Sequence, residues 1–244
     1  GWPLPADFDE LAEQVGKLVG PMRAGAGAPV LCHNDFYSPN LLVTGDDICL
    51  IDWEYAAMGD YGCDFGNFIA QGSGYSVERA LEALPYYFGR EATDEERLHC
   101  TACVAVVGWY WYVWALFKEC KGAPVGKWTR IWYDAAKDFS AAAQKMLDES
   151  CKNLHALTRP EFDALVAVEG GRGNEADAAV LARLADEGLV NRTSVGASLT
   201  TAGFMSLEPY RASSRRALAR ASCRSRSTPP SRSCASTASA SSSA

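Results

Sequence analysis

The stretch His33–Val43, HNDFYSPNLLV, continues after a polar turn into Ile48–Ala56, ICLIDWEYA, and decides how the rest of the chain is interpreted. The two runs gather one His, two Asp, two Asn and one Glu among apolar residues. The runs VLCH (30–33) and NLLV (40–43) are typical of short strands, and TGDD (44–47) is a hairpin turn signal. The polar cluster is therefore expected on a loop flanked by strands.

The spacing of the cluster indicates a chemistry. His33-x-Asp35-x4-Asn40, followed one hairpin later by Asp52, has the spacing of a phosphotransferase catalytic loop. In such a loop an Asp takes the proton of the attacking hydroxyl, and an Asn and a later Asp hold Mg²⁺ through oxygen atoms. A chance arrangement or another metal site is the alternative, since an H-x-D pair alone is weak. His33 is expected to pack beneath the loop rather than to bind metal.

Composition limits the class of protein. The chain has 244 residues, 48% of them hydrophobic, which suits one good-sized domain or a domain plus a module. Its nine Cys are odd in number, so a disulfide framework is not indicated and a cytoplasmic location is expected. The most apolar stretch, residues 100–117, is rich in Trp, Tyr and Gly and is interpreted as a buried helix rather than a membrane span.

Helical patterns dominate the remainder of the first 150 residues. Apolar residues at helical spacing predict helices over 7–20, 76–88, 93–120 and 127–149, the first ended by Gly and Pro. The predicted fold class is therefore α+β: a mostly helical lobe that carries a small catalytic β-hairpin.

Three segments together resemble a known family. HNDFYSPNLLV, LIDWEYAAMGDYGCDFGNF (50–68) and WYWYVW (109–114) look like the C-terminal lobe of the choline/ethanolamine kinases, within the aminoglycoside-phosphotransferase and protein-kinase-like superfamily. The resemblance covers residues 1–150. It implies a protein-kinase-like C-lobe that uses ATP and Mg²⁺, with the following roles: Asp35 as catalytic base, Asn40 and Asp52 as magnesium ligands, and Asp64 and Asn67 as braces of the loop.

The resemblance also points to a substrate, an amino alcohol. A quaternary ammonium cannot donate a hydrogen bond, so its site must use aromatic faces and negative charge. Trp111 and Trp114 match the W-x-x-W cage of the family, and Tyr55 and Tyr133 are candidate further walls. An aromatic stripe at this spacing is also typical of a core. Gln71 stands where the family often has an acid, which leaves choline, ethanolamine and related alcohols open.

The beginning of the chain departs from the family. About 28 residues precede the first strand, and they contain no phosphate loop and no strand Lys paired to a helix Glu. We therefore expect a fragment whose N-terminal lobe is missing. An aminoglycoside or other small-molecule hydroxyl kinase, and a non-catalytic remnant or binding module, remain the alternatives.

The last part of the chain differs in kind from the first. Residues 154–210 are similar to a winged-helix module, read as helix, helix and a hairpin-like end, with a plain helical hairpin as the alternative. The few basic residues make nucleic acid an unlikely partner. Residues 211–244, rich in Ser, Ala and Arg, are expected to be disordered, with a shifted reading frame as one hypothesis for their origin.

Overall fold

A computed structural model describes residues 4–72, 75–152, 154–193 and 196–211 of the chain. The described residues up to Leu207 form one compact unit, and residues 208–211 belong to a second. The architecture of the first unit is α+β and mostly helical, as predicted, with three small antiparallel sheets. From residue 212 onward, the predicted disordered tail lies outside the described residues.

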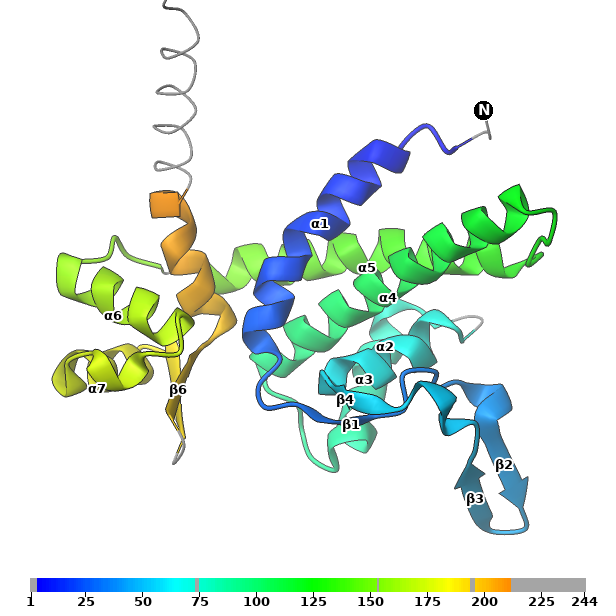
Figure 1. Cartoon of the computed structure of the whole chain (residues 1–244), viewed down its shortest axis with the longest axis horizontal. Helices are drawn as coiled ribbons and strands as arrows, with labels where there is room; N and C mark the ends of the chain where they lie inside the picture. Colours follow the sequence, from blue (N-terminus) through cyan, green and yellow to red (C-terminus); the bar gives the residue numbers. More distant parts are fainter. Residues whose placement is uncertain (1–3, 73–74, 153, 194–195, 212–244) are drawn as a thin grey trace, which may run out of the picture. The chain divides into compact units, whose positions relative to one another are not determined.

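The predicted hairpin is confirmed. Strand β2 (Leu41–Thr44) pairs with β3 (Asp47–Leu50), and Figure 1 shows the hairpin reaching away from the helices. The earlier strand β1 (Val30–Cys32) pairs instead with a strand that the sequence did not indicate, β4 (Ala57–Gly59). The loop between β1 and β2 therefore starts beside the end of the segment between β3 and β4. It ends beside the start of that segment.

Between residues 8 and 150 the described chain forms five helices: α1 (Phe8–Gly25), α2 (Tyr61–Ala70), α3 (Val77–Phe88), α4 (Asp94–Cys120) and α5 (Trp128–Ser150). The last three agree with prediction to within a residue or two. The prediction that α1 ends near residue 20 is wrong, because the helix continues through Pro21, whose side chain is buried. Helix α2 was not predicted; the Asp60 side chain caps it by accepting from the Gly62 amide.

Capping residues set where α3 and α4 begin. The Thr93 hydroxyl accepts from the Glu96 amide while the Glu96 carboxylate accepts from the Thr93 amide, so the two residues form a capping box at the start of α4. Ser76 caps α3 by accepting from the Arg79 amide, and Gly89, with φ +67°, ends that helix. These residues therefore define where α3 begins and ends and where α4 begins.

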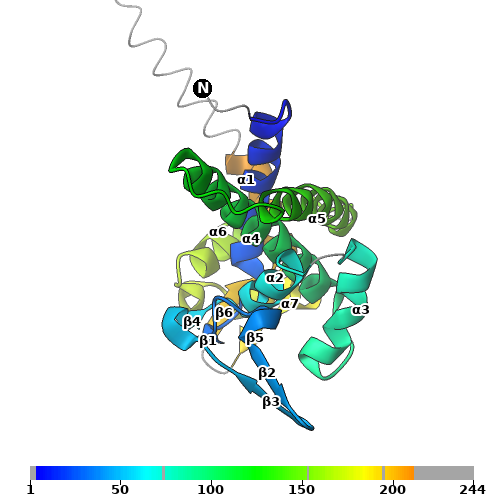
Figure 2. The same ribbon diagram turned by 90° about the vertical axis from the view of Figure 1, so that its right-hand side faces the viewer.

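Helices α4 and α5 lie side by side and carry the core, as Figures 1 and 2 show. Gly108 on α4 permits their close approach, because a Cβ there would lie 2.9 Å from the Ala136 amide nitrogen and 3.1 Å from the Trp132 carbonyl oxygen. One apolar cluster joins α1 through α5, and a second, aromatic cluster joins α1, α4 and α5. The second cluster borders the candidate site.

Helix α4 is also, within the described ranges, the one helix long and apolar enough to cross a membrane by length and composition. Half of its most apolar window is buried against the other helices. Burial of this kind fits the predicted role of the stretch as a core helix.

Residues 159–199 have their own apolar core. They comprise α6 (Arg159–Glu169), the short 3-10 helix Gly173–Glu175, α7 (Ala178–Asp186), and the hairpin of β5 (Val190–Thr193) and β6 (Gly196–Leu199). The hairpin comes earlier than expected, since residues 201–211 are helical rather than strand-like. The winged-helix interpretation stays a prediction.

Candidate functional site

The loop that follows β1 is held by one carboxylate. Asp64, on α2, accepts a hydrogen bond of 2.7 Å from the His33 amide through Oδ2 and another of 2.7 Å from the Asn34 amide through Oδ1. Asn34 adopts a left-handed backbone, φ +62°, which Asn tolerates better than most residues. The predicted brace Asp64 therefore lies where it can fix the chain path just before Asp35.

His33 lies beneath the loop, as predicted, and is buried. Its Nδ1 accepts from the Asp35 amide at 3.2 Å, so the proton is on Nε2, which donates to the Ile51 carbonyl at 2.8 Å. The ring also packs against Trp53, with 4.8 Å between ring centroids. His33 thus ties the loop to the end of β3 and leaves neither nitrogen free for a metal.

The Asp35 carboxylate is held by two side-chain amides. Gln71 donates from Nε2 to Oδ1 at 3.3 Å, and Asn40 donates from Nδ2 to Oδ2 at 3.3 Å and to the Asp35 carbonyl at 3.0 Å. Both amide side chains are buried, whereas Asp35 is half-buried. The carboxylate is therefore oriented by its neighbours while remaining open to an incoming group.

Asp52 lies at the mouth of the same loop. The Ile51 amide donates to the Asn40 carbonyl at 2.9 Å, which brings Asp52 next to Asn40. Asp52 is exposed and has a left-handed backbone, φ +67° and ψ +56°, a strained conformation for a residue with a Cβ. Because Asn40 donates from Nδ2 to Asp35, its Oδ1 is the remaining ligand atom. One amide oxygen and one exposed carboxylate fit the hard-oxygen preference of Mg²⁺.

A cavity of about 1040 Å³ opens beside Asp35. Five other residues of the predicted site share its wall: Tyr55, Asn67, Gln71, Trp111 and Trp114. The predicted magnesium ligands and the two residues beneath the loop, His33 and Asp64, are outside this lining. The structure therefore brings the predicted base and most of the predicted substrate residues to one cavity.

The sequence analysis missed two of the four tryptophans that line the cavity. Trp128 and Trp132, both on α5, line the cavity with Trp111 and Trp114. Trp132 stacks on Trp111 and on Trp128, with centroids 5.6 Å and 5.7 Å apart, while Trp111 and Trp114 meet edge to face at 5.5 Å. Their i, i+4 spacing on α5 was a usable signal, although it is equally typical of a core.

The prediction that Tyr133 forms a cavity wall is wrong. Its ring is buried against Tyr112, and its hydroxyl donates to the Asp7 carboxylate, which also accepts from Lys137. Successive residues on a helix point about 100° apart, so with Trp132 facing the cavity Tyr133 faces α1 instead. Its role is to attach the start of α1 to α5.

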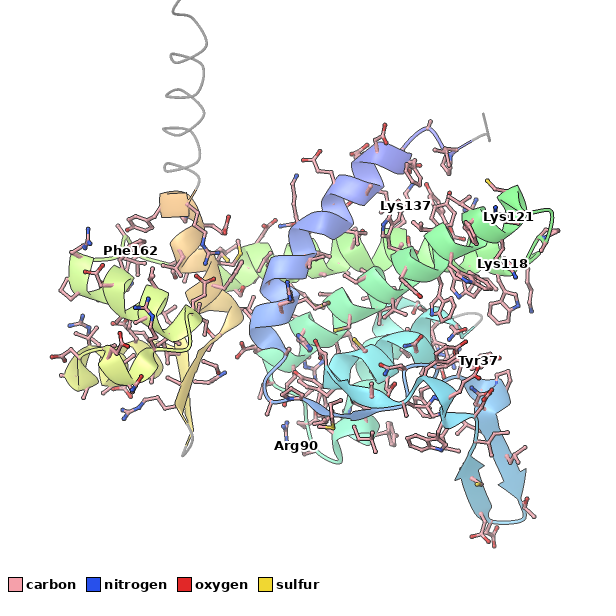
Figure 3. All side chains as sticks on the ribbon, viewed as in Figure 1. Tyr37, Arg90, Lys118, Lys121, Lys137 and Phe162 are labelled. Carbon is pink, nitrogen blue, oxygen red and sulfur yellow. The ribbon has the colours of Figure 1, made fainter. Side chains whose placement is uncertain are left out.

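Acidic groups gather near the aromatic walls. Burial raises the pKa of Tyr37, and the charges of Asp35 and Asp52 raise it further. The Glu54 carboxylate raises the pKa of Tyr55, with smaller contributions from Asp35 and Asp52. Figure 3 shows Tyr37 beside the base of the β2–β3 hairpin. Glu54 also lines the cavity, so the site offers a second carboxylate that the sequence analysis did not single out.

Known proteins resemble part of this chain. Residues 2–99 match the model of a family described as "Phosphotransferase enzyme family". A human protein named choline/ethanolamine kinase is 28% identical over 97 residues, 36% of this chain and 24% of its own length. Mouse ethanolamine kinase 2 is 27% identical over 135 residues, 48% of this chain and 33% of its own length. The chain thus spans a quarter to a third of the curated relatives that it matches.

Among solved structures, a choline/ethanolamine kinase family protein from Mesorhizobium loti aligns with a TM-score of 0.48 at 25% identity. That alignment covers 61% of this chain and 49% of the other.

Proposed function

We propose that this chain serves phosphoryl transfer from ATP to the hydroxyl of choline, ethanolamine or a related amino alcohol. The match of residues 2–99 to the phosphotransferase enzyme family and the similarity to choline/ethanolamine kinases support the proposal. One observation carries the proposal: Asp35, with the spacing of a catalytic base, opens onto the same cavity as four tryptophans.

Asp35 acts as the base because its carboxylate is already oriented toward the substrate hydroxyl. Gln71 and Asn40 hold the two oxygens of Asp35, so the carboxylate meets the substrate hydroxyl without first having to be ordered. Asp35 accepts the hydroxyl proton as the oxygen attacks the phosphoryl group. Asn40 and Asp52 are the residues that would hold Mg²⁺. Bound there with ATP, the ion would neutralise charge on the transferring group.

The aromatic walls suit a cation. A quaternary ammonium is attracted to indole faces, and the attraction grows when water is excluded. Two of these indoles already lie near ammonium groups, since Lys118 Nζ is 5.4 Å from the ring centre of Trp114 and Lys127 Nζ is 5.3 Å from that of Trp128. Glu54 and Asp35 add negative charge to the cavity lining. The indole faces and these two carboxylates together favour an amino alcohol over a neutral one.

A substrate panel tests the proposal. The protein is incubated with ATP and Mg²⁺ and with choline, ethanolamine, an aminoglycoside, or 3,3-dimethylbutanol, which has the shape of choline without its charge. We expect ADP release above the alcohol-free blank with choline or ethanolamine only. Transfer to the aminoglycoside alone would assign another hydroxyl kinase. Choline binding without any transfer would favour a binding module.

A further inference from the structure

Behind the loop, three side chains of metal-ligand type meet between α2 and α4. Nε2 of His99 lies 2.7 Å from Oδ1 of Asp60 and 3.6 Å from Sγ of Cys103, and the three atoms all lie within 4.8 Å of one another. His99 and Cys103 are buried. None of the three is used in the proposed phosphoryl transfer.

We propose that Asp60, His99 and Cys103 bind a zinc ion, with Cys63 as the fourth ligand. Carboxylate, imidazole and thiolate are the donors that zinc uses in closed tetrahedral sites. This site differs in its chemistry from the proposed magnesium ligands Asn40 and Asp52, because its soft sulfur donors favour Zn²⁺ over Mg²⁺.

The distances suit tetrahedral coordination. With zinc about 2.0 Å from nitrogen and about 2.3 Å from sulfur, those two ligand atoms lie roughly 3.5 Å apart. Nε2 of His99 and Sγ of Cys103 are 3.6 Å apart without a metal. Nε2 and Oδ1 of Asp60, now joined by a hydrogen bond of 2.7 Å, would have to separate by roughly half an ångström. A carboxylate at the N-cap of a helix, as Asp60 is for α2, can make that movement.

Gly62, which has no side chain, leaves room for an ion beside the three ligands. A Cβ at Gly62 would lie 2.6 Å from Sγ of Cys103 and 2.9 Å from Nε2 of His99, so any larger residue would fill the space beside the cluster. Cys63 follows directly. It adjoins the Cys103 thiol and also lines the large cavity, which provides a path for an ion from solvent.

The imidazole is free to change its proton position. Among the residues that the structure describes, Nδ1 of His99 has no hydrogen-bond partner although it is buried. Nothing therefore fixes the proton on Nε2 apart from Asp60 itself. When zinc binds Nε2, the proton moves to Nδ1 without breaking another hydrogen bond. Each coordinating thiol releases its proton to solvent, so binding should strengthen as the pH rises.

Cobalt(II) provides the test, because tetrahedral thiolate-bound cobalt absorbs visibly and zinc then displaces it. The full chain is stripped with a chelator and titrated with Co²⁺ in a non-thiol reductant. We expect one equivalent to bind with thiolate-to-cobalt and tetrahedral bands, and Zn²⁺ to abolish them. Zinc should also raise the melting temperature relative to chelator. Absence of these bands in the unaltered chain would overturn the proposal.

Two buried thiols on α4 make a matched pair of variants. Cys103→Ala should lose the bands, while Cys100→Ala, three residues away and equally buried, should keep them. Bands that persist in Cys103→Ala would place the metal on exposed thiols such as Cys49 and Cys120 and contradict the site. If Cys103→Ala does not fold, Asp60→Asn decides, since Asn caps a helix as well as Asp does. Its cobalt affinity should fall about tenfold or more, and an unchanged affinity would reject the site.

Discussion

Nε1 of Trp111, on α4, donates a hydrogen bond of 2.9 Å to Oδ1 of Asn67, on α2. The same oxygen accepts from Gln71 at 3.5 Å, and Gln71 also donates to Asp35. Two buried amides therefore connect the aromatic wall to the predicted base. A change that separates α2 from α4 should disturb both parts of the site together.

Removing an aromatic face should weaken binding of a cation selectively. Trp114→Ala takes away one indole of the cavity, a cation–π contact worth about 0.5–2 kcal/mol. The KM for choline should therefore rise roughly twofold to thirtyfold, and the KM for 3,3-dimethylbutanol much less. Phe117→Ala, an exposed aromatic on the same helix outside the cavity lining, is the control. Equal losses for both alcohols would argue against a cation site.

The loop should depend on the carboxylate that braces it. Asp64→Asn replaces an acceptor of two charge-assisted hydrogen bonds with an amide that offers one acceptor oxygen. We expect the free energy of unfolding to fall by about 1–3 kcal/mol and phosphoryl transfer to fall further, because Asp35 loses its position. Urea denaturation and initial rates measure the two effects. Asp47→Asn, on an exposed strand, should change neither, and a stable, fully active Asp64→Asn would refute the bracing role.

Two glycine substitutions should have opposite signs. Gly108→Ala places a methyl group 2.9 Å from the Ala136 amide nitrogen, so α4 and α5 must move apart at a cost of about 1–3 kcal/mol. Gly16→Ala lies within α1 with nothing within 4 Å of the added carbon, and should stabilise by roughly 0.5–1 kcal/mol. Thermal unfolding compares the two variants. Stabilisation by Gly108→Ala would mean that the helices do not approach as closely as described.

One ion pair should make stability depend on acid pH. The Arg90 guanidinium lowers the pKa of Glu96 from 4.5 to about 2, with help from the Thr93 amide. A lowered carboxyl pKa stabilises the folded state above the unfolded value, so this contribution is present above pH 4.5 and is lost as the pH falls toward 2. Because the Arg90 side chain is exposed and solvent screens its charge, the contribution of the pair is about 1 kcal/mol or less.

The Glu96→Gln variant distinguishes the contribution of the ion pair from that of the helix cap. Gln keeps the capping box but removes the ion pair, so the variant should be less stable than the parent chain at pH 7 and equally stable near pH 2. Glu91→Gln, at a more exposed ion pair with Arg97, is the control and should differ little at either pH. A Glu96→Gln deficit that persists at pH 2 would locate the effect in the cap instead.

Local sequence signals predicted much of the fold. Turn residues at 44–47 located the hairpin, and apolar residues at helical spacing located α3 and α4. Helix α2 was missed because Gly62 and Gly66 weaken its helical pattern, although Asp60 was a usable start signal. Strand β4 has three residues, too few to show a period. The pairing of β1 with β4 is long-range and leaves no local trace.

The candidate site was predictable where residues lie close in sequence. The spacing of His33, Asp35 and Asn40 correctly predicted that they lie on one loop. The position of Asp64 against that loop was predicted from the family resemblance. The sequence did not predict which side of α5 faces the cavity, because tryptophans at helical spacing are equally typical of a core and of a cavity wall. For that reason Trp132 was missed and Tyr133 was chosen wrongly.

The most direct test measures phosphoryl transfer and choline binding in the same preparation, with and without the Asp35→Asn substitution. The unaltered chain should transfer phosphate from ATP to choline or ethanolamine in the presence of Mg²⁺. Asp35→Asn should still bind choline, detected through tryptophan fluorescence, yet lose transfer by a factor of about 10² or more. Undiminished transfer by Asp35→Asn would contradict the assignment of Asp35 as the base, and binding without transfer by both proteins would contradict the proposed phosphoryl transfer.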